Sequence, residues 1–451
     1  MNKLFTIALL LFCVFSSGCK SDPPIKQPTH STSIPDLFGR EVIDIVQLPG
    51  ADTQIFRDGV NSELQSIQIA ADGSVKAINT WPFQTRARDS QQILRFADNT
   101  SFTAISSLAF LSVDSAGNVV TQGNWKDVLG LGDWSPGNSD RIELFGRSDD
   151  RYCIRSYADT SHYRINCYDQ NSDPIWSLVL DATTTGSLNG LIGTLDSEGN
   201  LYLFLTVSDH RFLRAYSNNG ALLWEQPADD VAGTYSKTLI WIGGKLVLVG
   251  ADASSSTDTQ YYFQQFNQDG TQYSSVSTTG YQHDLFFKAY QNNSILMMTS
   301  DQGGHLDLTR INIDGTEAWK KILVGRSVNL EFKTQQQPVR VDEDGNIALI
   351  NMSMEYVPSL LYFPVGVTNR YYISRFDSTG KQLQEDLIGR NRYRIVSDTD
   401  PTRTVESGFA PDEFVPTPTG YVAAGVNTYD LAEDNPNQTY SPPLVVNHYH
   451  W

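Results

Sequence analysis

The chain is poor in methionine, with 5 residues in 451, and it has no stretch rich in Ala, Glu, Lys and Leu. Helical bundles and coiled coils are built from such stretches, so both are disfavoured. The sequence has instead 33 Gly, 19 Pro and 21 Tyr, which is typical of turn-rich β proteins. Because 40% of the residues are hydrophobic, the chain can bury a large core. The composition therefore predicts a globular all-β protein with little helix.

Basic residues are also scarce, since 33 Lys and Arg stand against 51 Asp and Glu, for a formal charge of −18. Binding to phosphates requires clustered Lys and Arg, so we expect no nucleic-acid partner. Beyond the first residues, no uninterrupted apolar run is long enough for a transmembrane helix.

Signatures of common catalytic and metal sites are missing as well. The chain has no Gly-x-Ser-x-Gly, His-Glu-x-x-His, Cys-x-x-Cys or phosphate-binding Gly-x-x-x-x-Gly-Lys motif. Its seven histidines are scattered, and only His448 and His450 are close. Two ligands do not make a zinc site. The acidic run 342–346 could suggest calcium, but the recurring Asp and Asn positions favour turn formation. We therefore predict no metal and no catalytic residue.

The N-terminus has the three parts of a secretory signal peptide. A charged Met1-Asn2-Lys3 precedes the apolar run Leu4–Phe15, and Ser16-Ser17-Gly18 precedes Cys19. The cysteine makes residues 1–18 resemble a bacterial lipoprotein signal, which implies lipid attachment at Cys19; ordinary secretion is the alternative. Lys20 replaces the Asp that retains enteric lipoproteins in the inner membrane. The resemblance therefore implies an outer-membrane location, on the periplasmic or surface face.

Residues 19–35 are rich in proline and poor in apolar side chains. This segment is predicted to be an extended tether that lets the body, residues 36–451, stand at most roughly 50 Å from the lipid.

Two cysteines, Cys153 and Cys167, remain once Cys13 leaves with the signal and Cys19 takes lipid. They lie in two predicted strands, 151–157 and 163–169. A hairpin centred on Thr160 places the two cysteines directly opposite each other, so an oxidising compartment would permit a disulfide. Two buried free thiols are the alternative.

A strand–turn–strand motif recurs along the chain. It reads Val113-Asp-Ser-Ala-Gly-Asn-Val-Val120, Leu195-Asp-Ser-Glu-Gly-Asn-Leu-Tyr202 and Val341-Asp-Glu-Asp-Gly-Asn-Ile-Ala348. A second turn follows several copies and places Trp176, Trp224 or Trp319 five residues after an Asn or Asp. Four short strands with two hairpin turns form one unit of about 45 residues, which is the pattern of a β-propeller blade.

Counting the inner turns gives about eight blades, with seven as the alternative; these turns are near residues 73, 117, 149, 199, 244, 292, 345 and 419. The tryptophans are predicted to pack between blades. We expect the apolar run Val42–Val46 to close the ring by pairing with Leu444–Val446.

The turn followed by Gly-x-x-x-Trp resembles the repeats of quinoprotein-like (PQQ-repeat-like) β-propellers, which include a propeller lipoprotein of the outer-membrane barrel-assembly machinery. The resemblance covers roughly residues 60–430. The vicinal cysteines that quinone-dependent dehydrogenases place against their cofactor are absent, so we predict no quinone and no other cofactor.

Function on a repeat scaffold usually lies where the period is interrupted. The apolar interruption 354–364 could bind a partner or fold back over a blade edge, whereas the polar interruptions 397–412 and 430–443 are predicted surface loops. The partner-binding candidates are Tyr356, Leu360, Leu361, Tyr362 and Phe363.

Two functions remain open. The preferred one is a non-catalytic binding or scaffolding propeller of the cell envelope, with an envelope protein or a glycan as partner and the membrane contacted through the lipid. The alternative is an extracytoplasmic glycan hydrolase or lyase with its site at the mouth of the central channel.

Overall fold

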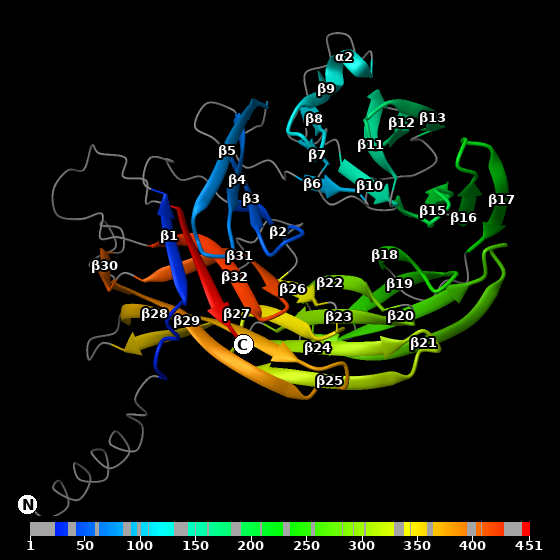
Figure 1. The fold of residues 1–451 in the computed structure, drawn as a ribbon. Helices are drawn as coiled ribbons and strands as arrows, with labels where there is room; N and C mark the ends of the chain where they lie inside the picture. Colours follow the sequence, from blue (N-terminus) through cyan, green and yellow to red (C-terminus); the bar gives the residue numbers. More distant parts are fainter. Residues whose placement is uncertain are drawn as a thin grey trace, which may run out of the picture.

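The computed structural model contains eight antiparallel sheets arranged in a ring (Figure 1), which confirms the prediction of an all-β propeller with eight blades. Seven sheets have four strands and one has five. The structure describes residues 23–34, 42–58, 63–83, 92–96, 101–106, 108–129, 143–148, 150–159, 162–181, 191–207, 210–228, 235–253, 258–281, 283–291, 293–301, 304–328, 338–342, 344–358, 364–394, 403–406, 408–427 and 444–451.

The first four blades use consecutive strands. Blade 1 contains β2 (Val42–Gln47), β3 (Thr53–Asp58), β4 (Glu63–Ile69) and β5 (Val75–Pro82). Blade 2 contains β6 (Gln92–Arg95), β7 (Phe102–Ile105), β8 (Ala109–Val113) and β9 (Val119–Asn124), followed by the helical turn α2 (Trp125–Val128). Blade 3 contains β10 (Glu143–Arg147), β11 (Arg151–Asp159), β12 (His162–Asp169) and β13 (Pro174–Asp181). Blade 4 contains β14 (Ile192–Leu195), β15 (Leu201–Val207), β16 (His210–Tyr216) and β17 (Leu222–Pro227).

The remaining blades differ at the end of the chain. Blade 5 contains β18 (Tyr235–Ile242), β19 (Lys245–Ala253), β20 (Asp258–Phe266) and β21 (Gln272–Tyr281). Blade 6 contains β22 (His283–Tyr290), β23 (Ser294–Ser300), β24 (His305–Asn312) and β25 (Glu317–Val324). Blade 7 contains β26 (Val339–Val341), β27 (Ile347–Pro358), β28 (Pro364–Phe376), β29 (Gln382–Arg394) and β30 (Arg403–Glu406). Blade 8 contains β31 (Phe409–Thr417), β32 (Gly420–Asn427), β33 (Leu444–His450) and β1 (His30–Ile34).

The first strand of each blade lies toward the centre of the ring, since β2, for example, contacts both β6 and β31. Hydrophobic clusters fill the spaces between neighbouring sheets. Because the strands of a blade alternate in direction, the hairpins between strands 1 and 2 and between strands 3 and 4 share one face of the ring, which we call the turn face. The hairpins between strands 2 and 3 and the connections between blades share the other, which we call the loop face.

One five-residue turn closes the hairpin between strands 3 and 4 in each of blades 1–7. The first residue of the turn donates its N–H to the carbonyl of the fifth, and the fourth donates to the carbonyl of the first. These turns begin at Ala70, Asp114, Asp169, Ser217, Asn267, Asn312 and Asp377. The same turn begins at Asp196 and Asp342, between strands 1 and 2. The turns near residues 73 and 117 are therefore outer hairpins, and counting them as inner turns was wrong, although the blade number is right.

The repeated tryptophans lie between blades, as predicted. Trp224 of blade 4 packs against Gly270 in the turn of blade 5, and its indole N–H donates to Gln268 O at 2.8 Å. Trp319 of blade 6 packs in the same way against Gly380. A Cβ atom at Gly270 would lie 2.7 Å from the Trp224 ring, and the φ of +81° is itself left-handed. Glycine is thus required at this position for two reasons.

The ring is closed by β1, and not by the predicted run Val42–Val46. Residues His30–Ile34 pair with Leu444–His448 of β33 and form the outer strand of blade 8. Val42–Gln47 is instead β2, the inner strand of blade 1. Apolarity identified the wrong segment because an outer strand faces solvent and needs few apolar residues; only Ile34 of β1 is buried. Part of the segment expected to be a tether is therefore a strand of the propeller.

None of the helical segments within the described ranges has the length and apolar character needed to cross a membrane.

Candidate functional site

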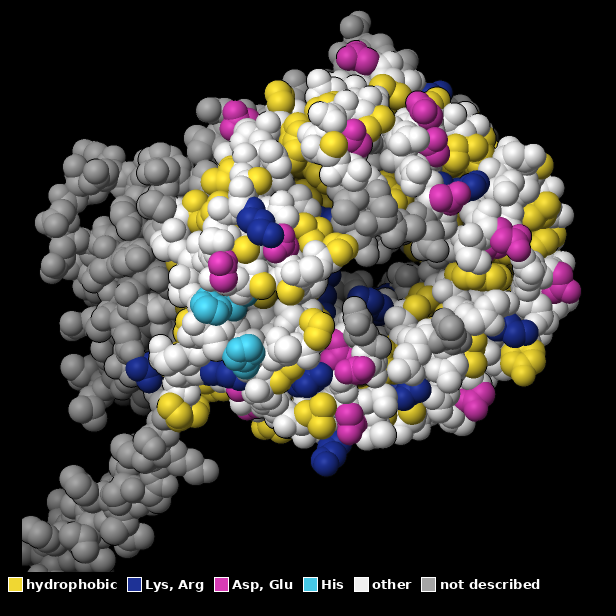
Figure 2. All heavy atoms as spheres, viewed as in Figure 1, with side chains coloured by type: hydrophobic (Ala, Val, Ile, Leu, Met, Phe, Trp, Pro, Cys, Tyr) yellow, Lys and Arg dark blue, Asp and Glu magenta, His cyan; other side chains and the backbone are white. Residues whose placement is uncertain are grey.

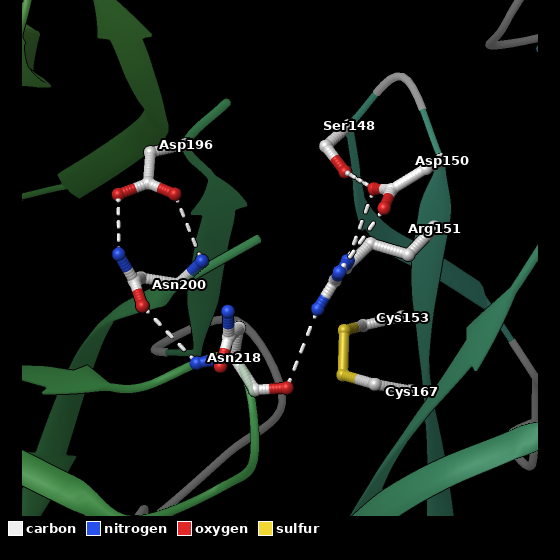
Figure 3. The surroundings of a disulfide bond; sticks show 8 residues. All are labelled: Ser148, Asp150, Arg151, Cys153, Cys167, Asp196, Asn200 and Asn218. Atoms are coloured by element: carbon white, nitrogen blue, oxygen red, sulfur yellow. Dashed lines mark hydrogen bonds and ion pairs between the residues drawn. A yellow bond between two sulfur atoms is a disulfide. The ribbon is translucent and has the colours of Figure 1, made fainter. Parts of the chain in front are cut away.

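A disulfide bond joins Cys153 and Cys167 (Figure 3). The two residues are direct partners in the register of β11 and β12, with Cα atoms 4.1 Å apart, as the hairpin centred on Thr160 predicts. Both are fully buried in the cluster between blades 3 and 4, among Leu201, Leu203 and other apolar side chains. This location supports a structural role for the bond.

Polar contacts beside the disulfide join the same two blades (Figure 3). Arg151 of blade 3 donates to both carboxylate oxygens of Asp150, at 3.0 and 3.1 Å, and to Asn218 O of blade 4 at 3.3 Å. Hydrogen bonds from Arg151 hold the pKa of Asp150 below its ordinary value. Asp196 accepts from the backbone and side chain of Asn200, whose Oδ1 accepts from Asn218 N. Asp196 thus stabilises the turn between β14 and β15, and Asn200 of this turn contacts the turn between β16 and β17.

The predicted partner-binding segment lies at the end of an elongated hairpin of blade 7. Strands β27 and β28 have 12 and 13 residues, and they pair as far as Pro358 and Pro364. Tyr356 is in β27, but its side chain is outside the described part of the structure. Leu360, Leu361, Tyr362 and Phe363 lie outside the described residues altogether, as does Cys19. The structure thus shows the two strands that flank the segment, β27 and β28, and does not test the binding candidates.

An ion-pair network joins the inner strands of three neighbouring blades. Arg340 of β26 lies 3.0 Å from Glu413 of β31 and 3.3 Å from Asp44 of β2. These strands are the inner strands of blades 7, 8 and 1, so one guanidinium holds the last blade between its two neighbours. The ring is therefore held closed in two places. The ion pairs of Arg340 join the inner strands of blades 7, 8 and 1, and β1 pairs with β33 to complete the outer edge of blade 8.

Glu413 is the buried acid of this network. Its residue is only 3% exposed, and burial raises the pKa of its carboxyl from 4.5 to about 7, against the opposing attraction of Arg340. Its Oε1 atom is buried and has no hydrogen-bond partner. A carboxyl that titrates near neutrality can act as an acid or base, but this one is held in the wall and shielded from solvent.

The centre of the ring is open in the space-filling view, with Lys or Arg side chains at the edge of the opening (Figure 2). Cationic residues on the inner strands include Arg95, Lys237, Lys288 and Arg340. Arg95 donates to Gln54 of blade 1 at 2.7 Å, so its guanidinium, like that of Arg340, bridges neighbouring blades.

Lys26 fixes the chain that precedes β1. Its ammonium group lies 2.7 Å from Asp386 of β29, donates to the carbonyl of His450 and lies 5.6 Å from the centre of the Tyr421 ring. Asp386 also accepts from the Tyr421 hydroxyl at 3.0 Å, and the Lys26 N–H donates to Leu387 O. We call the contacts of Lys26 with Asp386, Tyr421 and His450 the Lys26 latch.

His448 and His450 lie in one strand, β33, and two of the histidines have close side-chain neighbours. His448 faces His30 of β1, with ring centres 6.3 Å apart, and burial lowers the pKa of His448. His305 bonds Asp301 at 2.7 Å. In the described part of the chain, no three His, Cys, Asp or Glu side chains are grouped so that they could hold a metal ion.

Sequence reasoning missed the ion-pair network and the Lys26 latch. Both depend on residues hundreds of positions apart, and neither has a local motif. A charged residue within a short inner strand, such as Asp44 in Val42–Gln47, was the one signal available for the network.

Comparisons with known proteins show no matching family model and no matching curated protein. Several solved structures are similar in fold. The WD40 domain of SCAP from fission yeast is 8% identical, with a TM-score of 0.46, and the match covers 93% of this chain and 94% of that one. An uncharacterised protein from Listeria monocytogenes is 11% identical, with a TM-score of 0.43 and coverage of 84% and 100%. Apo AztD from Citrobacter koseri is 11% identical, with a TM-score of 0.42 and coverage of 76% and 86%.

Proposed function

We propose that the protein is a lipid-anchored β-propeller of the cell envelope that binds or scaffolds an envelope protein or glycan without catalysing a reaction. The observation that carries the binding role is the elongated hairpin of blade 7, whose strands β27 and β28 extend into the apolar segment 354–364 from both sides. Met354, at the start of this segment, is 45% exposed. The signal-like residues 1–18 and Cys19 support anchoring, and the repeat pattern supports a relationship to quinoprotein-like propellers.

The anchor is tested by Cys19→Ala. We expect this variant to lose labelling by a radioactive or clickable fatty acid and to move from the membrane fraction to the soluble fraction, because no other acylation site is proposed. Cys13→Ala is the matched control, since this residue is predicted to leave with the signal, and it should retain both label and membrane association. Membrane association of Cys19→Ala equal to that of the unmodified protein would refute the assignment.

The binding segment is tested by replacing Leu360, Leu361 and Phe363 together with Ser. We expect at least a tenfold loss of cross-linked or co-purified envelope partner, with an unchanged melting temperature, because interface energy is concentrated in a few apolar anchors. Leu222→Ser with Leu223→Ser is the control, since these side chains are 56% and 54% exposed on the outer strand of blade 4. Undiminished capture, or a large loss of stability in the triple variant alone, would show that the segment is structural.

One observation favours the alternative function, a glycan hydrolase or lyase. Two carboxylates and a cation lie together on the inner strands of three blades, in the side chains of Asp44, Glu413 and Arg340. Their role in joining three blades, together with the burial of Glu413, favours the structural interpretation.

A further inference from the structure

Two histidines face each other in the strand pair that closes the ring. His30 of β1 and His448 of β33 are direct partners in the antiparallel register, and their ring centres are 6.3 Å apart with the ring planes at 81°. The carbonyl of His448 also accepts from the N–H and the hydroxyl of Thr29, at 2.8 and 2.9 Å. The side chain and the backbone of His448 therefore both lie against the closing segment.

The side chain of His448 lies where a positive charge is unfavourable. Its Nε2 atom is buried and has no hydrogen-bond partner among the described residues, and its neighbour in β32 is the apolar Val422. A protonated imidazole carries an N–H on both nitrogens, and a buried donor without an acceptor costs free energy. Burial, with a smaller contribution from the charge of His30, lowers the pKa of His448.

Two other titratable groups act on this pair. A charge on His30 repels a charge on His448, because the two side chains are directly opposite each other. Asp72 lies in the β4–β5 turn of blade 1, and hydrogen bonds from Ser74, with a smaller contribution from the charge of His30, lower its pKa. Attraction by Asp72 and repulsion by His448 therefore oppose each other at His30, so we expect the sensitivity to pH to lie mainly at His448.

We infer that the pairing of β1 with β33 is a pH-sensitive closure, in which protonation of His448 favours release of β1. Release makes β33 an edge strand, takes His30 away and lets water reach the imidazole. The released form therefore binds a proton more readily than the closed form, and a lower pH favours it. The closed form has its full stability above pH 6.5, the ordinary pKa of histidine, and loses stability as the pH falls below that value. This inference depends neither on the lipid anchor nor on the segment 354–364.

Amide hydrogen exchange of the full chain at pH 7.5 and pH 5.5 tests the closure, after correction for the intrinsic exchange rate at each pH. Peptides that cover His30–Ile34 report the opening of β1, and peptides from β15 report a blade built without it. We expect the opening constant of β1 to be at least about threefold larger at pH 5.5. Titration of His448 alone limits the increase to about tenfold, because its ordinary pKa is 6.5. The opening constant of β15 should change by less than about twofold.

Two variants identify the titrating group. His448→Gln keeps a neutral polar side chain and should abolish the pH dependence of β1 opening, whereas His305→Gln, which changes a histidine of blade 6, should retain it. A dependence that persists in His448→Gln, or a change below about twofold in the unmodified protein, would overturn the inference. Exchange of the imidazole C2 hydrogen, followed by mass spectrometry, measures the pKa of His448 without any substitution. A value at or above 6.5 would overturn the inference even if His448→Gln failed to fold.

Discussion

A protein truncated so that its mature body begins at residue 36 is expected to lose more than about 3 kcal/mol of unfolding free energy or to fail to fold. Truncation removes β1, which supplies five register pairs with β33, the buried Ile34 side chain and the Lys26 latch. Each net hydrogen bond contributes about 1 kcal/mol, and burial of an aliphatic side chain contributes about 2 kcal/mol. The free energy of unfolding is measured by urea titration with tyrosine and tryptophan fluorescence.

Rescue in trans distinguishes the missing strand from a general effect of shortening the chain. A peptide of residues 24–36 should raise the urea midpoint of the truncated protein, and a peptide of scrambled sequence should not. Replacing only residues 23–25 with Gly-Ser-Gly is the matched control and should change the stability little, because Lys26 and β1 remain. An unchanged midpoint after truncation would show that β1 does not close the ring.

Arg340→Met is expected to cost about 3–5 kcal/mol of unfolding free energy at pH 8, because it leaves Asp44 and the buried Glu413 without their cation. Arg214→Met removes a partly exposed partner of Glu225 and should cost less than about 1 kcal/mol. A loss for Arg340→Met no larger than this control would show that the network does not support the closed ring.

Glu413→Gln tests the same network through its pH dependence. The carboxyl of Glu413 has a pKa of about 7 in the folded chain, above its ordinary 4.5. Its contribution to stability is therefore fully present below pH 4.5 and is lost as the pH rises through 7. The stability of Glu413→Gln relative to the unmodified protein should increase between pH 4.5 and pH 8, by at most about 3 kcal/mol. Parallel stability curves for the two proteins would contradict the raised pKa.

Local patterns in the sequence predicted the local parts of the fold. The predicted hairpin centred on Thr160 placed Cys153 opposite Cys167, and the recurring turn residues predicted eight blades, because a hairpin is determined by neighbouring residues. The same turn occurs at both inner and outer hairpins, so the sequence could not tell Gly117 of an outer hairpin from Gly199 of an inner one. Their hydrogen bonds are the same.

The non-local parts of the structure could not be predicted in this way. β1 reads His-Ser-Thr-Ser-Ile, and a strand exposed on its outer side carries almost no hydrophobic signal. The inner network combines residues 44, 340 and 413, whose proximity depends on closure of the whole ring. The binding candidates Leu360, Leu361 and Phe363 were chosen from an interruption of the repeat, which located an elongated hairpin but not a bound partner.

Closure by β1 also has a consequence for the order of folding. Each of blades 1–7 is built from consecutive residues and can form soon after its own segment has been synthesised. Blade 8 must wait, because its first-made strand pairs with its last-made strand across about 410 residues. Such long-range pairing is slow, and until it occurs the outer edge of β33 remains open. An open edge pairs readily with other chains, so strand-swapped oligomers are the expected by-product of crowded or interrupted synthesis.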